Sequence, residues 1–385
     1  MDDRTFDTLT RWLSQRWNRR AAALAVASLA APWRDVLTET VKGKQGGRKK
    51  STLCLDGQAI QAAGKKKKKL LKQGATPGAC PSSPPPLPAS PPPTACTPQC
   101  VAKACGGSDG CGGTCACPSG ALCHEGVCRD CTVVCRGTDV ACGAALSQAL
   151  LDGGTIYACP GRYVGTFTIG VNNVTLIGAG SGTDPVTSTI LDARDNGRVL
   201  TIQDEITRVT LIGLRLTGGN LGDTAPGGAI RATAADVQVK ACAIERNIAL
   251  YGGGIYLTGR LRLTNSSVSH NDASNGGGLY LDSCDPSFIT DSVIAENSAT
   301  MGIGGGLLSG YMKLTVVGTE ITNNEASSGG GGIANYAGDL ILDAACHIHD
   351  NTSGAPGGGG IYNNGTVQLN GATVAGNTPD QCKDC

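Results

Sequence analysis

The stretch YGGGIYLTGRLRLTNSSVSHN, residues 251–271, contains the pattern that decides the fold. It carries three glycines near its start and an asparagine at its end. Between them, aliphatic residues alternate with other residues, first at Ile255 and Leu257 and then at Leu261 and Leu263. An alternation with a period of two indicates short β-strands that bury one face. Strands this short do not form a stable sheet alone, so the stretch predicts a unit that depends on similar neighbours.

The same pattern recurs along the second half of the chain, with successive copies 24 to 28 residues apart. The glycine landmark precedes Ile230, Ile255, Leu279, Leu307, Ile333 and Ile361. The asparagine landmark falls at Asn220, Asn247, Asn271, Asn297, Asn324, Asn351 and Asn377. A repeat of this length is typical of a solenoid, in which each unit forms one coil and buries its apolar face against the next.

The aliphatic pairs of successive units predict what fills the interior of this solenoid. The pairs are Val237/Val239, Leu261/Leu263, Leu314/Val316, Leu340/Leu342 and Val367/Leu369. Each pair places two side chains on one face of a strand, and stacked coils join them into an apolar ladder. The chain has 57 glycines but only three phenylalanines and three tryptophans, so small and aliphatic side chains must fill the core. We expect about eight to ten coils over residues 143–385, spaced roughly 4.8 Å apart.

The two landmarks predict the corners of each coil. Glycine supplies backbone conformations with positive φ and lets neighbouring backbones approach closely. Asparagine also tolerates the left-handed region, and stacked asparagines can hydrogen-bond along the axis as a ladder of side-chain amides. We therefore assign the seven asparagines a structural role at the turns.

The paired landmarks GG[IL] and [VI]xxN resemble the repeats of the polymorphic outer-membrane proteins of chlamydiae. More broadly, they resemble the right-handed parallel β-helices of the pectin-lyase-like class. The resemblance covers about residues 143–382 and implies an all-β, right-handed parallel β-helix that adheres to or binds other molecules. This chain departs from the family where it has valine or isoleucine in place of the phenylalanine that the family favours.

The first 33 residues predict an export signal. Arg16, Arg19 and Arg20 precede the apolar run AAALAVASLAA, residues 21–31, which is followed by no long apolar extension. An amphipathic N-terminal helix is the alternative. The apolar run is too short for an ordinary membrane-spanning helix, and no other segment is apolar enough to act as a transmembrane anchor.

Residues 34–95 predict a disordered basic and proline-rich linker. The runs KGKQGGRKK and GKKKKKLLKQ repel themselves, and PSSPPPLPASPPPTACTP favours an extended spacer. The basic runs suit an anionic cell-wall polymer, a membrane surface or nucleic acid. Nucleic acid is the weakest of these because no aromatic residues are interleaved with the lysines, and the net charge of the whole chain is only +1.

Residues 96–142 predict a small disulfide-rich module, since most of the 19 cysteines fall between Cys96 and Cys159. This density indicates an oxidising compartment, and a zinc site is the less favoured alternative because the module has one histidine and no paired CxxC blocks. After the module, residues 143–154 predict a short capping helix that buries Leu146, Leu150 and Leu151.

One column of titratable residues is a candidate for catalysis. Arg246, His270, Glu296, Asn323 and Asp350 occupy equivalent positions, two residues after a β-branched residue. If the register holds, they lie on successive coils, where neighbours could act as a general acid–base pair or grip a sugar. The alternative is a solvated stripe with weak ion pairing. No adjacent aspartate pair of the kind that an inverting hydrolase uses occurs in the repeats.

Metal binding and cofactors are not predicted. The cluster Cys346, His347, His349 and Asp350 contains suitable ligand types. However, His347 and His349 share one face of a strand and Cys346 points to the other.

The sequence as a whole favours an exported or cell-surface β-helix with a structural, adhesive or glycan-binding role and no catalytic activity. Its expected partners are cell-wall or extracellular polysaccharides or surface proteins. The alternative is a polysaccharide lyase or glycoside hydrolase with Arg246, His270, Glu296 and Asp350 at its site. Fold alone does not separate these two functions.

Overall fold

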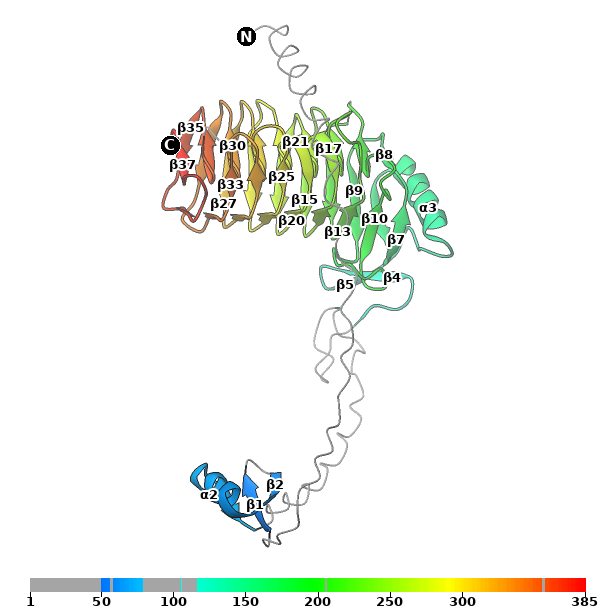
Figure 1. Cartoon of the computed structure of the whole chain (residues 1–385). Coiled ribbons are helices and arrows are strands. Elements are labelled where there is room, and N and C mark those ends of the chain that lie inside the picture. The colour runs from blue at the N-terminus through cyan, green and yellow to red at the C-terminus, as the bar shows by residue number, and fades with distance from the viewer. Residues whose placement is uncertain (1–49, 56–57, 79–104, 106–115, 205, 355–356) are drawn as a thin grey trace, which may run out of the picture. The chain divides into compact units, whose positions relative to one another are not determined.

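The computed structural model describes residues 50–55, 58–78, 105, 116–204, 206–354 and 357–385. The chain divides into two units, Met1–Pro92 and Pro93–Cys385, which are described separately (Figure 1). The predicted export signal, the proline-rich stretch and the first part of the Cys-rich module lie outside the described residues.

The second unit is a parallel β-solenoid, drawn from green to red in Figure 1. Each coil contributes one strand to each of three parallel sheets, and each of these sheets has nine strands. A fourth, five-stranded sheet lies alongside in the later coils. The predicted all-β parallel β-helix and its number of coils are therefore confirmed.

The strands of each sheet come from successive coils. Sheet 1 contains β6 (Thr155–Ala158), β9 (Val174–Gly178), β12 (Arg208–Ile212), β15 (Asp236–Lys240), β19 (Arg260–Thr264), β23 (Ser287–Thr290), β27 (Lys313–Val317), β31 (Asp339–Leu342) and β35 (Thr366–Gln368). Sheet 2 contains β7 (Gly161–Val164), β10 (Thr189–Asp192), β13 (Leu214–Thr217), β16 (Ala243–Glu245), β20 (Ser267–Ser269), β24 (Val293–Ala295), β28 (Glu320–Thr322), β32 (His347–His349) and β36 (Thr373–Ala375). Sheet 3 contains β8 (Phe167–Ile169), β11 (Leu200–Ile202), β14 (Ile230–Ala232), β18 (Ile255–Leu257), β22 (Leu279–Leu281), β26 (Leu307–Ser309), β30 (Ile333–Asn335), β34 (Ile361–Asn363) and β37 (Cys382–Lys383). Sheet 4 contains β17 (Ile248–Tyr251), β21 (Asp272–Asn275), β25 (Ser298–Ala299), β29 (Glu325–Ala326) and β33 (Thr352–Ser353).

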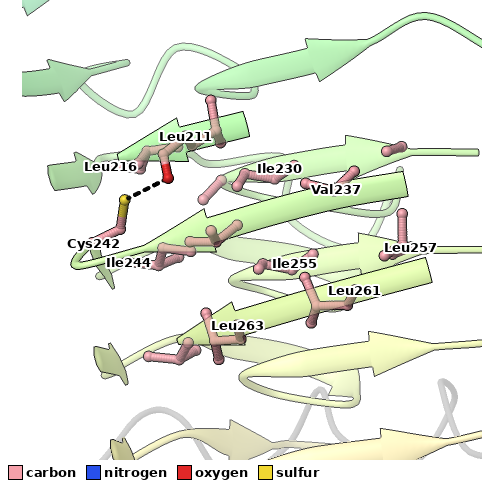
Figure 2. Packing of buried hydrophobic residues seen from close by; sticks show 14 of the residues in the cluster. Leu211, Leu216, Ile230, Val237, Cys242, Ile244, Ile255, Leu257, Leu261 and Leu263 are labelled. Carbon is pink, nitrogen blue, oxygen red and sulfur yellow. Dashed lines mark hydrogen bonds between the residues drawn. The ribbon is translucent and has the colours of Figure 1, made fainter. Parts of the chain in front are cut away.

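The interior is an aliphatic ladder, as the alternating pairs predict. Val237 and Val239 of β15 are in register with Leu261 and Leu263 of β19, and all four side chains are fully buried. Figure 2 shows Val237, Leu261 and Leu263 pointing into the space between the sheets, together with Ile230, Ile255 and Leu257 of sheet 3. The last predicted pair, Val367/Leu369, is only partly buried because β35 is the edge strand of sheet 1.

Helix α3 (Asp139–Asp152) packs against β7 and β8, at the amino-terminal end of the solenoid. Its first turn is capped by Thr138, whose side chain accepts a hydrogen bond from the Ala141 amide at 3.3 Å. The helix therefore starts four residues before the predicted position. Leu146 and Leu150 are fully buried as predicted, but Leu151 is 61% exposed, because it lies about 100° around the helix from Leu150.

Two disulfides tie the described end of the Cys-rich segment to the first coil and to helix α3. Cys131 pairs with Cys159, just after β6, and Cys135 pairs with Cys142 in α3. Of the two, the Cys131–Cys159 bridge crosses the boundary predicted at residues 142/143 and ties the described end of the Cys-rich segment covalently to the solenoid. Further bridges between described residues are Cys105–Cys123, Cys117–Cys128 and Cys382–Cys385. Cys123 and Cys128 lie in the hairpin of β4 (Ala121–His124) and β5 (Val127–Asp130).

The described part of the first unit is a small folded element, not the disordered linker expected over residues 34–95. It consists of β1 (Ser51–Leu55), β2 (Gln58–Ala62), α2 (Gly64–Lys72) and β3 (Thr76–Pro77). The strands form an antiparallel sheet in the order β2–β1–β3, with a small core of Leu53, Ala62 and Ala75. The apolar residues on both sides of the lysine run form this core. The prediction of disorder considered the charge of the lysine run and not these apolar residues.

Six of the seven landmark asparagines form a continuous buried ladder. They are Asn247, Asn271, Asn297, Asn324, Asn351 and Asn377, each no more than 4% exposed. Each of the first five donates from Nδ2 to Oδ1 of the next at 2.9 to 3.0 Å. The same Oδ1 also accepts the backbone amide of the preceding asparagine at 2.9 to 3.1 Å. A second Nδ2 hydrogen bond reaches a carbonyl one coil back, so the side-chain amides are satisfied inside the core.

The structure corrects two details of the asparagine prediction. The left-handed residue is the one before each ladder asparagine, and the asparagines themselves do not have positive φ. Asn220 also stands outside the ladder, because Gly219 occupies the ladder position in its coil and donates its amide to Asn247 Oδ1 at 2.8 Å. Asn220 is instead partly exposed and accepts from the Gly222 amide.

The glycine landmark packs directly on this ladder. Gly276 has φ of +60° and makes the turn, whereas Gly278 provides clearance. A Cβ at Gly278 would lie 2.5 Å from the Gly306 carbonyl oxygen and 3.0 Å from Nδ2 of Asn297. The close contact between the glycine and the asparagine side chain therefore explains why both landmarks recur in every repeat.

A second, shorter ladder occupies the corner between sheets 1 and 2. The amide of Cys242 donates to Ser266 Oγ, the amide of Ser266 donates to Ser292 Oγ, and the amide of Ser292 donates to Thr319 Oγ1. In the sequence, this ladder corresponds to a small polar residue or cysteine two positions before each β-branched residue. This position is not one of the two landmarks from which the fold was predicted.

Replacing Asn297 by alanine should lower the free energy of unfolding by roughly 3 kcal/mol, because it removes the acceptor of the Asn271 amide, one of the two hydrogen bonds of Asn271 Nδ2 and the side-chain donor to the Val268 carbonyl inside the core. Denaturant unfolding measures the loss. The matched control Asn220→Ala changes a landmark outside the ladder and should cost less than about 1 kcal/mol. Equal losses in the two variants would contradict the structural role of the ladder.

Candidate functional site

The candidate column lies on the outer corner that follows sheet 2. Arg246, His270, Glu296, Asn323 and Asp350 directly precede the ladder asparagines and have φ of 54° to 55°. The corner needs a left-handed residue on every coil, and glycine takes this place at Gly218 and Gly376. The five residues therefore do occupy equivalent positions on successive coils, as the sequence predicts. The left-handed backbone conformation of the corner is sufficient to explain this alignment.

Only one neighbouring pair in the column is in contact. His270 Nε2 lies 2.5 Å from Glu296 Oε2, and both side chains are about half exposed. Arg246 contacts Glu245 of its own coil at 3.3 Å, and Glu245 also pairs with Arg215. Exposed pairs of this kind contribute at most about 1 kcal/mol.

None of the column residues lines the hollow between the loops that follow β8 and β11. That hollow has a volume of about 330 Å³ and is lined by Gly170, Val171, Asn172, Gln203, Asp204 and Ile206. A general acid or base must come within hydrogen-bond reach of a bound substrate, and a convex, solvated corner holds a substrate weakly. The geometry therefore favours the solvated-stripe interpretation of Arg246, His270, Glu296 and Asp350.

His349, next to the column, lies within ion-pair distance of two carboxylates, whereas His270 has one. Its Nδ1 lies 2.8 Å from Asp350 Oδ2 and its Nε2 lies 3.1 Å from Glu320 Oε1 on the neighbouring coil. The hydrogen bond with Asp350 raises the pKa of His349 above its ordinary value of 6.5, burial opposes this shift, and the hydrogen bond with Glu320 adds to it.

The cysteines do not add a metal ligand set to these histidines. Cys346 is buried, and its thiol points to the Val316 carbonyl at 3.3 Å and to Asp343 at 3.1 Å. The sulfurs of Cys105, Cys117 and Cys128 come within 4.8 Å of one another, but all three belong to disulfides and have no thiolate to offer.

A strip of tyrosines lies on the surface of the solenoid, and none of them is among the site residues predicted from the sequence. We define the tyrosine strip as Tyr251, Tyr256, Tyr280, Tyr311 and Tyr336. Tyr256 and Tyr280 are in register on β18 and β22, and their rings stack with centroids 5.3 Å apart. Tyr251 lies 5.3 Å from the ring of Tyr280, and Tyr311 meets Tyr336 edge to face at 5.9 Å.

The backbone positions of four of these tyrosines explain why their rings lie on the surface. Tyr256 and Tyr280 are the middle residues of three-residue strands whose outer two residues point inward, so their rings must point outward. Tyr311 and Tyr336 follow β26 and β30 at the corner between sheets 3 and 1 and are 64% and 47% exposed. Burial, and then the nearby Asp282 and neighbouring tyrosines including Tyr311, raises the pKa of Tyr280 to about 12. The Tyr280 hydroxyl therefore stays neutral at physiological pH.

Polar groups continue the strip toward the amino-terminal coils. Arg231 is in register with Tyr256 and donates to Asp204 at 3.1 Å. Asp204 also accepts from Thr233 and lines the hollow described above. The pKa of Asp204 is lowered by the Thr233 hydrogen bond and by the charge of Arg231. One side of the solenoid thus carries a charged and polar region followed by an aromatic one.

Comparison with family models finds none that matches the chain, and no curated protein and no solved structure matches it. The fold and the site geometry are therefore the basis for assigning a function. Neither α2 nor α3, the helices in the described part of the chain, is long and apolar enough to cross a membrane.

The environment of His349 predicts a measurable pH dependence. Because its pKa is raised in the folded state, its stabilising contribution is complete below about pH 6.5 and is lost as the pH rises through the folded-state value. An NMR titration of the imidazole should give a pKa above 6.5 that falls in Asp350→Asn. An unchanged pKa in that variant would show that the hydrogen bond with Asp350 does not form in solution.

Proposed function

We propose that the protein is an extracellular or cell-surface binding rod that holds a linear polysaccharide along its tyrosine strip, without catalysis. The observation that carries this proposal is the row of tyrosine rings beside Arg231, Asp204 and Asp282, in which Tyr256 and Tyr280 are in register and partly buried and Tyr311 and Tyr336 are exposed. The repeat resembles those of pectin-lyase-like and chlamydial surface β-helices, and this resemblance also implies a protein that binds other molecules.

The chemistry of the strip suits a sugar polymer. Tyrosine offers an apolar ring face together with a hydroxyl that remains hydrated, which matches the alternation of C–H faces and hydroxyl edges in a sugar. Carboxylate and guanidinium groups beside the rings can form charge-assisted hydrogen bonds with hydroxyls. Coils lie roughly 4.8 Å apart, so a chain laid along the axis would meet a new side chain at each coil.

The disulfides support a location outside the cytosol. Four of them fall between Cys105 and Cys159, and disulfides of this density persist in oxidising compartments. The asparagine ladder supports a rigid solenoid, because side-chain hydrogen bonds in the core join each coil to the next in addition to the hydrogen bonds between strands.

Removing exposed rings of the strip should weaken polysaccharide binding. Tyr311→Ala and Tyr336→Ala should each reduce affinity about fivefold, since an aromatic contact is worth roughly 1 kcal/mol. The measurement is affinity electrophoresis or calorimetry against a panel of soluble linear polysaccharides. Tyr311→Phe keeps the ring and should retain most of the affinity, and Val186→Ala, at an exposed apolar residue away from the strip, should have no effect. If the wild-type protein binds no member of the panel, or if Val186→Ala weakens binding as much as the tyrosine variants, the proposal is wrong.

The enzymatic alternative is tested by product formation. Prolonged incubation of the wild-type protein with acidic polysaccharides should yield no new reducing ends and no unsaturated products. Products that form with the wild-type protein and disappear in both His270→Ala and Glu296→Ala would instead establish a hydrolase or lyase at the His270–Glu296 pair.

A further inference from the structure

Helix α2 presents a continuous face of exposed lysines. Lys65, Lys68, Lys69 and Lys72 are spaced i, i+3, i+4 and i+7, so they lie on one side of the helix. All four side chains are exposed. The face extends about 10 Å along the helix axis, given a rise of 1.5 Å per residue.

The opposite side of α2 is anchored to the sheet of the same unit. Leu70 packs against the core formed by Leu53, Ala62 and Ala75. Lys67, which lies on this inner side, donates from Nζ to Ser51 Oγ at 2.9 Å. The anchoring fixes which lysines face solvent, and a free lysine-rich linker would have no such face.

No acidic side chain compensates this face within the described residues 50–55 and 58–78. Like charges at i, i+3 and i+4 spacing destabilise a helix by a few tenths of a kcal/mol per pair. Lys65 is also placed unfavourably, at the positive end of the helix dipole. An anionic partner would relieve both effects at once.

We propose that this lysine face is a second binding site, separate from the tyrosine strip, for a linear acidic polysaccharide. Lysine acts as a point charge and does not require the planar, bidentate geometry that arginine uses on phosphate. Residues 50–78 contain no aromatic side chain on which a nucleic-acid base could stack. A flexible polymer with regularly spaced carboxylates needs only closely spaced cations, and the disulfides of the second unit favour an extracellular partner of this kind.

The test compares the full chain with the variant Lys65→Gln/Lys68→Gln/Lys69→Gln/Lys72→Gln, using polygalacturonate as the probe and fluorescence anisotropy as the readout. Wild-type affinity should fall roughly tenfold or more between 50 and 200 mM salt. At 50 mM salt the variant should bind at least about tenfold more weakly and show a flatter salt dependence. Glutamine keeps the helix propensity, and circular dichroism checks that the fold is retained.

The matched control removes the same number of positive charges from exposed positions of the second unit, as Arg129→Gln/Arg208→Gln/Lys240→Gln/Lys313→Gln. It should retain affinity within about twofold. Equal losses in both quadruple variants, or tighter lysine-face binding to duplex DNA than to polygalacturonate, would overturn the proposal. Tyr311→Ala should leave the salt-dependent component intact, so failure of the lysine face and failure of the tyrosine strip give different results.

Discussion

The buried asparagine ladder is the interaction on which the rest of the solenoid depends. An amide in an apolar core is costly unless both its donors and its acceptor are used. Asn271, Asn297 and Asn324 meet this demand only when the next coil stands directly above, in one register. The glycine beneath each amide must lack a Cβ, and the residue before it must adopt the left-handed conformation. One set of hydrogen bonds therefore sets the register, the glycine runs and the shape of the corner.

This constraint also explains the column that first suggested catalysis. The position before each ladder asparagine must project outward from a left-handed corner, where side chains such as Arg246 and Asp350 meet solvent. Polar and charged residues collect there because the corner is exposed. By contrast, the outward positions of sheet 3 are set by strand alternation and leave the choice of side chain free, and it is there that Tyr256 and Tyr280 form a shared surface.

The amino-terminal end of the solenoid is finished by different means. Helix α3 covers the first coil with Leu146 and Leu150, and Gly143 allows its backbone to approach β7 so closely that a Cβ would lie 1.9 Å from the Val164 carbonyl oxygen. The Cys131–Cys159 bridge then fixes the preceding segment to that first coil, and the Cys135–Cys142 bridge fixes it to the helix. A disulfide stabilises mainly by restricting the unfolded chain, which suits a segment with few apolar residues of its own.

The sequence by itself determined the repeat, the inward-facing pairs such as Val237/Val239, and the coil as the unit of structure, because period-two burial and repeated turn residues are local properties of the chain. It also singled out the six asparagines whose side-chain amides form the ladder. It did not distinguish Asn220 from them, since a one-residue shift is visible only in the register between coils. It also did not show that residues 50–78 fold, that Tyr311 approaches Tyr336, or that His270 meets Glu296 while Arg246 turns to Glu245. These outcomes depend on which side chains of separate coils or strands come together, and only the tertiary structure decides that.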